Sequence, residues 1–167
     1  MSTFSPSAPW TPSPASPPPE ALNYVHPGRT FSSSEAIPLV TVVGTGIVVC
    51  LWDASRRIGG LAHFLLPEVG SAPSAPRYGD VAMKAVLDQL VAQGASPRTL
   101  RARIFGGCAP PISSESGHLG ERNVAAAAAF LQAHGIPVLE RDVGGRVARK
   151  VVFDPALGVA TVTRVGV

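Results

Sequence analysis

The scarcest side chains capable of chemistry in this 167-residue chain are two cysteines and four histidines. A thiolate beside a histidine is the arrangement that proteins use for nucleophilic attack on carbonyl and amide carbons. Cys50 stands within the apolar run IVVCLW, which favours a buried and unreactive thiol. Cys108 follows two glycines in an expected loop, where it could be exposed, but no histidine lies near it in the sequence. The sequence alone therefore does not place a histidine base beside either thiol.

The histidines show no metal-ligand spacing with one another, with the cysteines or with the carboxylates; they are His26, His63, His118 and His134. We therefore predict no metal and no cofactor. Gly44-Thr45-Gly46 begins like a phosphate-binding loop, but the next glycine of that motif would fall at Val49, and a strand follows instead of a helix. Glycines at this point would instead let a substrate approach the backbone and leave main-chain N–H groups free as donors.

Composition limits the class of protein. Hydrophobic residues make up 46% of the chain and the net charge is +3, with the basic residues scattered among acidic ones. No basic cluster or motif indicates nucleic-acid binding, no apolar run is long enough for membrane insertion, and no signal peptide is visible. We expect a monomeric cytoplasmic protein with one folded domain.

The first part of the chain differs from the rest. Seven prolines fall within the first twenty residues, mixed with serine and alanine, and such a tract buries too little surface to fold. We assign residues 1–30 to a disordered tail and residues 31–167 to the folded domain.

Periodicity and turn residues predict the elements of that domain. Strands are expected at about 38–52 (interrupted at 44–46), 58–66, 100–105, 137–140, 146–153 and 159–165, and helices at about 78–93 and 120–134. Hairpins and helices alternate without a regular strand–helix–strand repeat. This favours a mixed α+β fold in which β-sheet layers are flanked by helices.

Five motifs, in order, resemble the chemoreceptor glutamine deamidase (CheD) family. They are residues 41–67 (TVVGTGIVVCLWDASRRIGGLAHFLLP), 77–80 (RYGD), 103–107 (RIFGG), 119–124 (LGERNV), and 142–145 with 149–150 (DVGG and RK). Together the matches span roughly residues 38–160. Leu119 replaces the family's isoleucine and Ala148 its glycine. The resemblance implies the family's fold and its setting in bacterial chemotaxis.

The resemblance also implies roles for particular residues. The family's nucleophile is a cysteine, and its position here is Gly46; the family's catalytic histidine is His63, 17 residues later. The threonine that orients that histidine lies six residues before the cysteine in the family. That position is Val40 here, so the threonine is either lost or shifted to Thr41. Gly44, Thr45 and Phe64 are expected to contact the substrate.

Two functions remain open. The first is a catalytically silent family member that binds the cytoplasmic helices of methyl-accepting chemotaxis receptors, a CheC-type phosphatase, or both. The second is an active protein-glutamine deamidase that uses a displaced nucleophile, either Cys108 or Cys50. The glycine at position 46 favours the first.

Overall fold

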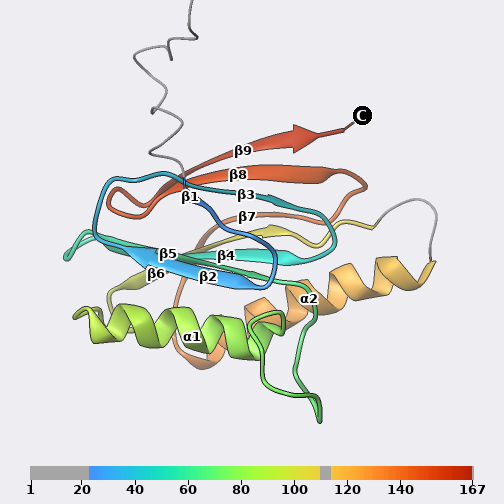
Figure 1. Cartoon of the computed structure of the whole chain (residues 1–167), viewed down its shortest axis with the longest axis horizontal. Coiled ribbons are helices and arrows are strands. Elements are labelled where there is room, and N and C mark those ends of the chain that lie inside the picture. The colour runs from blue at the N-terminus through green and yellow to red at the C-terminus, as the bar shows by residue number, and fades with distance from the viewer. Residues whose placement is uncertain (1–22, 110–113, 167) are drawn as a thin grey trace, which may run out of the picture.

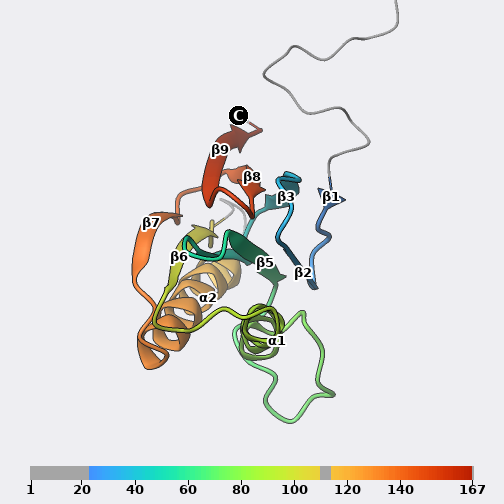
Figure 2. The same cartoon turned by 90° about the vertical axis from the view of Figure 1, so that its left-hand side faces the viewer.

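The computed structural model describes residues 23–109 and 114–166, and these form three layers (Figure 1). One β-sheet, sheet A, forms the outer layer, a second, sheet B, forms the middle layer, and two helices cover the far face of sheet B. Viewed from the side (Figure 2), both helices lie on the same side of the two sheets. The expected α+β class with helix-flanked sheet layers is confirmed. No helix in the described part of the chain is long and apolar enough to cross a membrane.

Sheet A has the strand order β1-β3-β8-β9. Its strands are β1 (Asn23–Tyr24), β3 (Leu39–Val43), β8 (Ala148–Asp154) and β9 (Val159–Val165). The pair β1 and β3 is parallel, whereas β3–β8 and β8–β9 are antiparallel.

Sheet B has the order β2-β5-β4-β6-β7. Its strands are β2 (Arg29–Ser33), β5 (Ile58–Phe64), β4 (Ile47–Asp53), β6 (Leu100–Gly106) and β7 (Val138–Val143). Only the β6–β7 pair is parallel. Because sheet B is the middle layer, β4 and β5 are buried on both faces, which explains why their sequences are almost continuously apolar.

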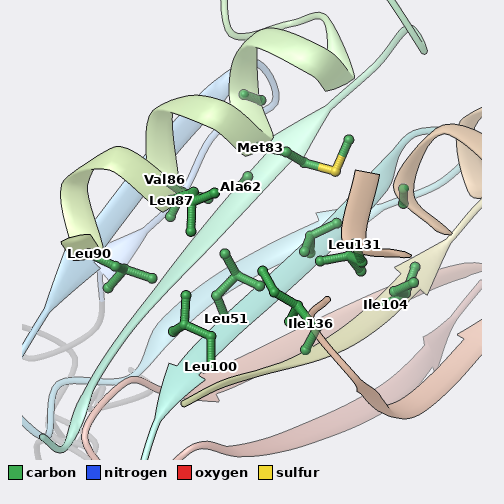
Figure 3. Packing of buried hydrophobic residues seen from close by; sticks show 14 of the residues in the cluster. Leu51, Ala62, Met83, Val86, Leu87, Leu90, Leu100, Ile104, Leu131 and Ile136 are labelled. Atoms are coloured by element: carbon green, nitrogen blue, oxygen red, sulfur yellow. The ribbon is translucent and has the colours of Figure 1, made fainter. Parts of the chain in front are cut away.

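The helices are α1 (Gly79–Ala92) and α2 (Ser114–Ala133). The buried face of α1 includes Ala82, Met83, Val86 and Leu90, at helical spacing. These side chains meet Leu51, Ala62, Leu100 and Ile104 of sheet B in one apolar core, to which Leu131 and Ile136 also contribute (Figure 3). A second core lies between the two sheets and contains Leu39, Val48, Phe105, Val151 and Phe153.

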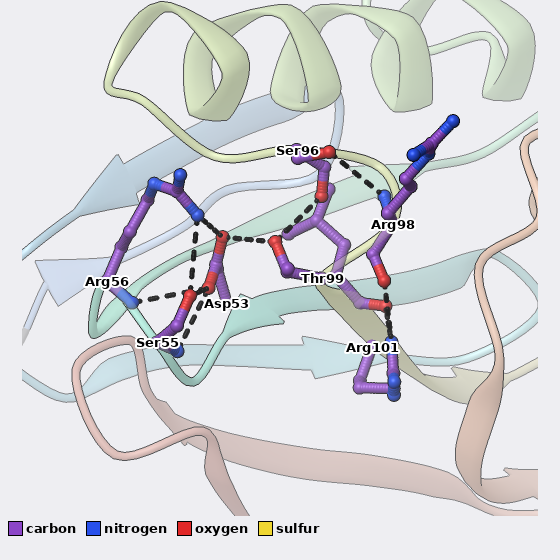
Figure 4. Close-up of polar contacts among 8 residues, drawn as sticks. Asp53, Ser55, Arg56, Ser96, Arg98, Thr99 and Arg101 are labelled. Carbon is purple, nitrogen blue, oxygen red and sulfur yellow. Dashed lines mark hydrogen bonds and ion pairs between the residues drawn. The ribbon is translucent and has the colours of Figure 1, made fainter.

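The hairpin between β4 and β5 is held by a buried carboxylate (Figure 4). Asp53 accepts hydrogen bonds from Ser55 and Arg56 of the turn, and from the Thr99 hydroxyl at 2.6 Å. Burial acts to raise the pKa of Asp53, but the hydrogen bonds from Thr99, Ser55 and Arg56 outweigh it and hold the pKa at about 2. The turn is thereby tied to the segment that leads into β6.

Three boundaries differ from the expectation. The strand expected at 38–52 is two strands in different sheets, because the chain crosses from sheet A to sheet B at residues 44–46. Residues 23–30, assigned to the tail, carry β1 and the start of β2, so the folded part begins before residue 31. Strands β1 and β2 are short and polar, so their sequences lack the alternation of apolar residues that predicts a strand. Residues 1–22 of the expected tail lie outside the described residues. Helix α2 begins at Ser114, earlier than expected.

Candidate functional site

The β3–β4 turn, residues 44–46, lies at one end of the two-sheet sandwich, where two other loops meet it. The Gly46 carbonyl accepts a hydrogen bond from the N–H of Gly107 at 2.8 Å, and the Gly44 carbonyl accepts one from Cys108 at 3.1 Å. Asn123 of α2 donates through Nδ2 to the carbonyls of Thr45 and Leu65, each at 3.0 Å. The turn is therefore fastened to the ends of β5 and β6 and to α2.

His63 lies on β5 and is only 1% exposed. Its strand neighbours are Val48 of β4 and Arg29 of β2. Gly46 directly precedes β4, and its nearest neighbours at the end of β5 are Phe64 and Leu65, one and two residues after His63. Burial lowers the pKa of His63 to about 4, and the imidazole is therefore neutral at physiological pH.

The hydrogen bonds around Thr41 determine which nitrogen of His63 carries the proton. The Thr41 hydroxyl lies 2.8 Å from Nδ1 of His63 and 2.7 Å from the carbonyl oxygen of Val25, to which it donates. A hydroxyl has one proton, and a carbonyl can only accept. Nδ1 of His63 must therefore carry a hydrogen and donate it to Thr41. This leaves the lone pair on Nε2, the arrangement that a general base needs.

Position 46 has no room for a side chain. A Cβ built on Gly46 would lie 2.5 Å from the carbonyl oxygen of Phe64 and 3.3 Å from a methyl carbon of Leu65. The first distance is shorter than any ordinary contact and involves backbone, which cannot rotate away. Gly44 is different, because a Cβ there would meet only the sulfur of Cys108, at 3.7 Å. A cysteine at position 46 would require the turn to move.

The two cysteines lie in different surroundings. Cys50 is 1% exposed in the core between the sheets, and burial raises the pKa of its thiol far above the usual range. It is separated from position 46 by four strand residues, roughly 13 Å at the rise of a β-strand. Cys108 is also buried, but it lies against the β3–β4 turn at Gly44. Of the two thiols, Cys108 alone adjoins the turn.

Phe64 does not line the site, contrary to the expectation from the sequence. Its side chain is fully buried on the other face of β5, in the core beneath the helices, where it packs against the start of α1 at Gly79. Neighbouring residues of a strand face opposite ways, so His63 and Phe64 cannot both face the space between the sheets. Gly44 and Thr45 are half-buried in the turn itself.

Sequence reasoning missed three residues that build this region. Val25 lay in the segment assigned to the tail, and no sequence signal marks it. Asn123 and Arg149 belong to motifs that carried the family resemblance, but no role was assigned to them. Arg149 is 1% exposed, pairs with Asp142 at 3.1 Å and donates to the carbonyls of Gly106 and Gly144. It therefore joins the end of β6 to the end of β7 and the β7–β8 loop.

Other features of the surface lie apart from His63. A hollow of about 360 Å³ lies between α1 and α2, and its lining includes Met83, Arg122 and Phe130 but neither His63 nor Gly46. Among the side chains that the structure describes, those of residues 23–109 and 118–166, no three His, Cys, Asp or Glu gather closely enough to hold a metal ion.

Known proteins resemble this chain over most of its length. A family model described as CheD chemotactic sensory transduction matches residues 65–164. A probable chemoreceptor glutamine deamidase CheD of Trichlorobacter lovleyi is 38% identical over 143 residues, covering 84% of this chain and 89% of that protein. The chain belongs to the CheD family.

Two further CheD relatives are similarly close. Probable CheD 1 of Anaeromyxobacter dehalogenans is 40% identical over 141 residues, covering 83% of this chain and 82% of that protein. Probable CheD 1 of Albidiferax ferrireducens is 37% identical over 140 residues, which cover 84% of this chain and 60% of that protein. The chain thus spans only part of the latter relative. Among solved structures, the Bacillus licheniformis hypothetical protein YfiH has a TM-score of 0.44 and 16% identity, covering 68% of this chain and 49% of that one.

The match to the CheD family model begins at Leu65, directly after the candidate site, and includes neither Gly46 nor His63. The alignments with individual CheD proteins, which cover 83–84% of the chain, are long enough that they must include both positions. The region of the candidate site therefore belongs to the part that is shared with CheD relatives, but it lies outside the part that matches the family model.

Proposed function

We propose that this CheD-family chain is a catalytically silent chemotaxis protein. In this proposal it acts in the bacterial cytoplasm, where it binds the cytoplasmic helices of methyl-accepting chemotaxis receptors, a CheC-type phosphatase, or both. Silence means that it does not convert receptor glutamine to glutamate, because that reaction needs a nucleophile beside the base.

The observation that carries the proposal is the contact at position 46. Glycine supplies no nucleophile, and the Phe64 carbonyl oxygen occupies the space that a Cβ would need, at 2.5 Å. The backbone of β5 therefore packs directly against Gly46 and leaves no space for a side chain at that position. An active site that had merely lost its cysteine by a recent substitution would still have room for one.

The length of the turn gives a physical reason for this packing. The family resemblance places the orienting threonine six residues before the nucleophile. Here the threonine bonded to the histidine is Thr41, five residues before position 46. We infer that the turn is one residue shorter than in the family, which draws Gly46 against β5 and excludes a side chain.

A second candidate, an active deamidase, rests on Cys108. Its sulfur would lie 3.7 Å from a Cβ at Gly44, so it adjoins the turn that holds position 46. The buried position of Cys108 and the lack of a described hydrogen bond to His63 favour the silent protein. Cys50 is not a candidate, because burial keeps its thiol protonated.

Binding is tested separately from catalysis. Leu65 is 39% exposed and its side chain covers position 46, so it is the apolar group that a docked receptor helix would meet. We expect Leu65→Asp to weaken binding of a receptor cytoplasmic fragment at least about tenfold. Leu157→Asp is the matched control, because Leu157 is 49% exposed in the β8–β9 turn at the opposite end of the sandwich.

Binding is measured by calorimetric titration with the receptor fragment and, separately, with a CheC-type phosphatase. If neither protein binds, or if both leucine variants bind as the unchanged protein does, then this surface is not the docking site.

A further inference from the structure

The two sheets have four edges, and three of them are protected from pairing with another chain. An exposed edge strand presents unpaired N–H and C=O groups, and native proteins block such edges by shortness, charge or covering groups. β1 has only two residues. β2 is bridged by Gln89 and Gln93 of α1, which donate to Thr30 and Ser32. β7 carries Glu140, Arg141 and Asp142 in succession and has a register shift against β6.

The fourth edge, β9, is long and uncovered in the described part of the chain, and its only protection is one charge, Arg164. It is seven residues long and pairs with β8 along its whole length without a register shift. Its sequence, VATVTRV, has one charge and no proline. Val159 and Val165 are 56% and 40% exposed. β9 is the outermost strand of sheet A (Figure 1), and within residues 23–109 and 114–166 no strand pairs with its outer side.

The order of residues in β9 indicates what pairs with it. VATVTRV reads almost the same in both directions: valine at both ends and at the centre, and threonine on either side of the centre. Antiparallel pairing about a two-fold axis places each residue opposite its mirror position in the second strand. A sequence that is nearly its own mirror image is therefore complementary to itself.

We propose that β9 pairs antiparallel with β9 of a second copy of this chain, with the two-fold axis at Val162. Sheet A then continues through the interface as one eight-stranded sheet. This register places Val159 opposite Val165 and Thr161 opposite Thr163, and such β-branched pairs stabilise antiparallel strands. This proposal gives a dimer, whereas a monomer was expected from the sequence. The dimer proposal does not rest on the proposed function.

The single charge of β9 agrees with this register. Arg164 lies opposite Ala160 of the second strand, so the two arginines are not directly opposed. Val162 lies opposite itself, and both Ala160 and Val162 already pack against the core between the sheets. Arg164 shares this inner face, as its pairing with Arg149 of β8 shows. The interface therefore joins Ala160 and Val162 of the two copies on the inner face, and no two like charges lie directly opposite each other across it.

The test is the mass of the full-length chain in solution, measured by sedimentation velocity over a wide range of concentrations. We expect a concentration-dependent shift from one chain to two. Thr161→Lys with Thr163→Lys, which places four positive charges around the axis, should weaken the dimer at least about tenfold. Thr161→Glu with Thr163→Glu should do the same. Val138→Lys with Leu139→Lys, on the β7 edge, is the matched control and should leave dimerisation unchanged.

An equimolar mixture of the lysine and glutamate variants tests the register itself. Each introduced lysine then faces a glutamate, so we expect dimers containing one chain of each kind. Hydrogen exchange of the unsubstituted chain gives a second test that does not depend on any variant folding. Outward-facing amides of β9 should exchange more slowly at high protein concentration than at low.

Three results would overturn the proposal. They are a full-length chain that stays monomeric at all concentrations, a dimer that the lysine pair does not weaken, and β9 amides whose exchange is independent of concentration. Protection of these amides at every concentration in a monomer would show instead that another part of the same chain covers the edge.

Discussion

Thr41 donates its hydroxyl proton to the Val25 carbonyl and accepts a hydrogen bond from Nδ1 of His63. This relationship joins β3 to β5 and to the segment after β1, across the space between the two sheets. The bond leaves the lone pair of His63 on Nε2, and position 46, where the family resemblance places the nucleophile, is a glycine. In the proposed function, the Thr41–His63 pair therefore has no nucleophile to activate.

Replacing Thr41 should show how much its hydrogen bonds contribute to the free energy of unfolding. Thr41→Val leaves both Nδ1 of His63 and the carbonyl of Val25 without their described partner. We expect a loss of about 1–3 kcal/mol in the free energy of unfolding, measured by urea denaturation. Thr41→Ser keeps the hydroxyl and should retain the Nδ1–H tautomer in nitrogen NMR spectra of His63. A Thr41→Val protein with the same stability and the same tautomer would refute the bond.

His63 should make the protein less stable in mild acid. Its pKa is about 4 in the folded protein against 6.5 for the ordinary group, so between these values the unfolded chain binds a proton that the folded protein does not. Stability is then complete above pH 6.5 and falls as the pH falls towards 4. Between pH 7 and pH 5 we expect His63 to account for a loss of about 2 kcal/mol.

The measurement is urea unfolding at both pH values for the unchanged protein and for His63→Gln, which cannot titrate. The variant should lose less stability between pH 7 and pH 5 by about that amount. Equal losses in the two proteins would mean that His63 is exposed enough to titrate normally.

The β3–β4 turn should tolerate a methyl group at one glycine and not at the other. Gly46→Ala places a Cβ against the Phe64 carbonyl and should cost about 1–3 kcal/mol. Gly44→Ala, two residues away, meets only ordinary contact with Cys108 and should change stability by less than about 0.5 kcal/mol. Thermal unfolding of the two variants decides this, and equal effects would contradict the proposed packing of the turn.

Asn123 should prove to be a structural anchor of the site. Its amide group donates to Thr45 and Leu65, while its Oδ1 is buried with no hydrogen-bond partner in the described part of the chain. Asn123→Ala should cost about 1–3 kcal/mol, because two carbonyls lose their donor. Asn123→Asp should be less stable still at neutral pH, because a carboxylate would face two carbonyl oxygens. Chemical denaturation compares them, and an Asp variant more stable than the Ala variant would argue against these contacts.

The sequence predicted the layers of the fold because its strands and helices carry clear apolar periods. The run IVVCLW indicated a buried strand, and the face of Ala82, Val86 and Leu90 indicated a helix on the core. Residues 44–46 were predicted only as an interruption of one strand. Three polar or small residues are compatible both with a bend within a strand and with a turn that leads from one sheet to the other. That crossing depends on the long-range pairing of Leu39 with Phe153 and of Ile47 with Gly106.

The site was only partly predictable. His63 and Gly46 follow from the family motif, whereas the orienting threonine was expected to be either lost or shifted to Thr41. The hydrogen bond between Thr41 and His63 favours the shift. The proton position on His63 depends in addition on the bond from Thr41 to Val25, in a segment too polar to be recognised as part of the fold. Phe64 was expected to contact the substrate, but it lies on the face of β5 opposite His63, in the core beneath the helices. The blocked Cβ at Gly46 depends on how closely β5 approaches the turn, which no local pattern encodes.

Catalytic silence is tested most directly by mass spectrometry of a receptor cytoplasmic fragment after incubation with this protein, with a CheD relative that carries the cysteine as the positive control. We expect glutamine-to-glutamate conversion no faster than in buffer, for this protein and for its Cys108→Ser and His63→Gln variants alike. Time-dependent conversion by this protein that disappears in Cys108→Ser would contradict silence and identify Cys108 as the nucleophile.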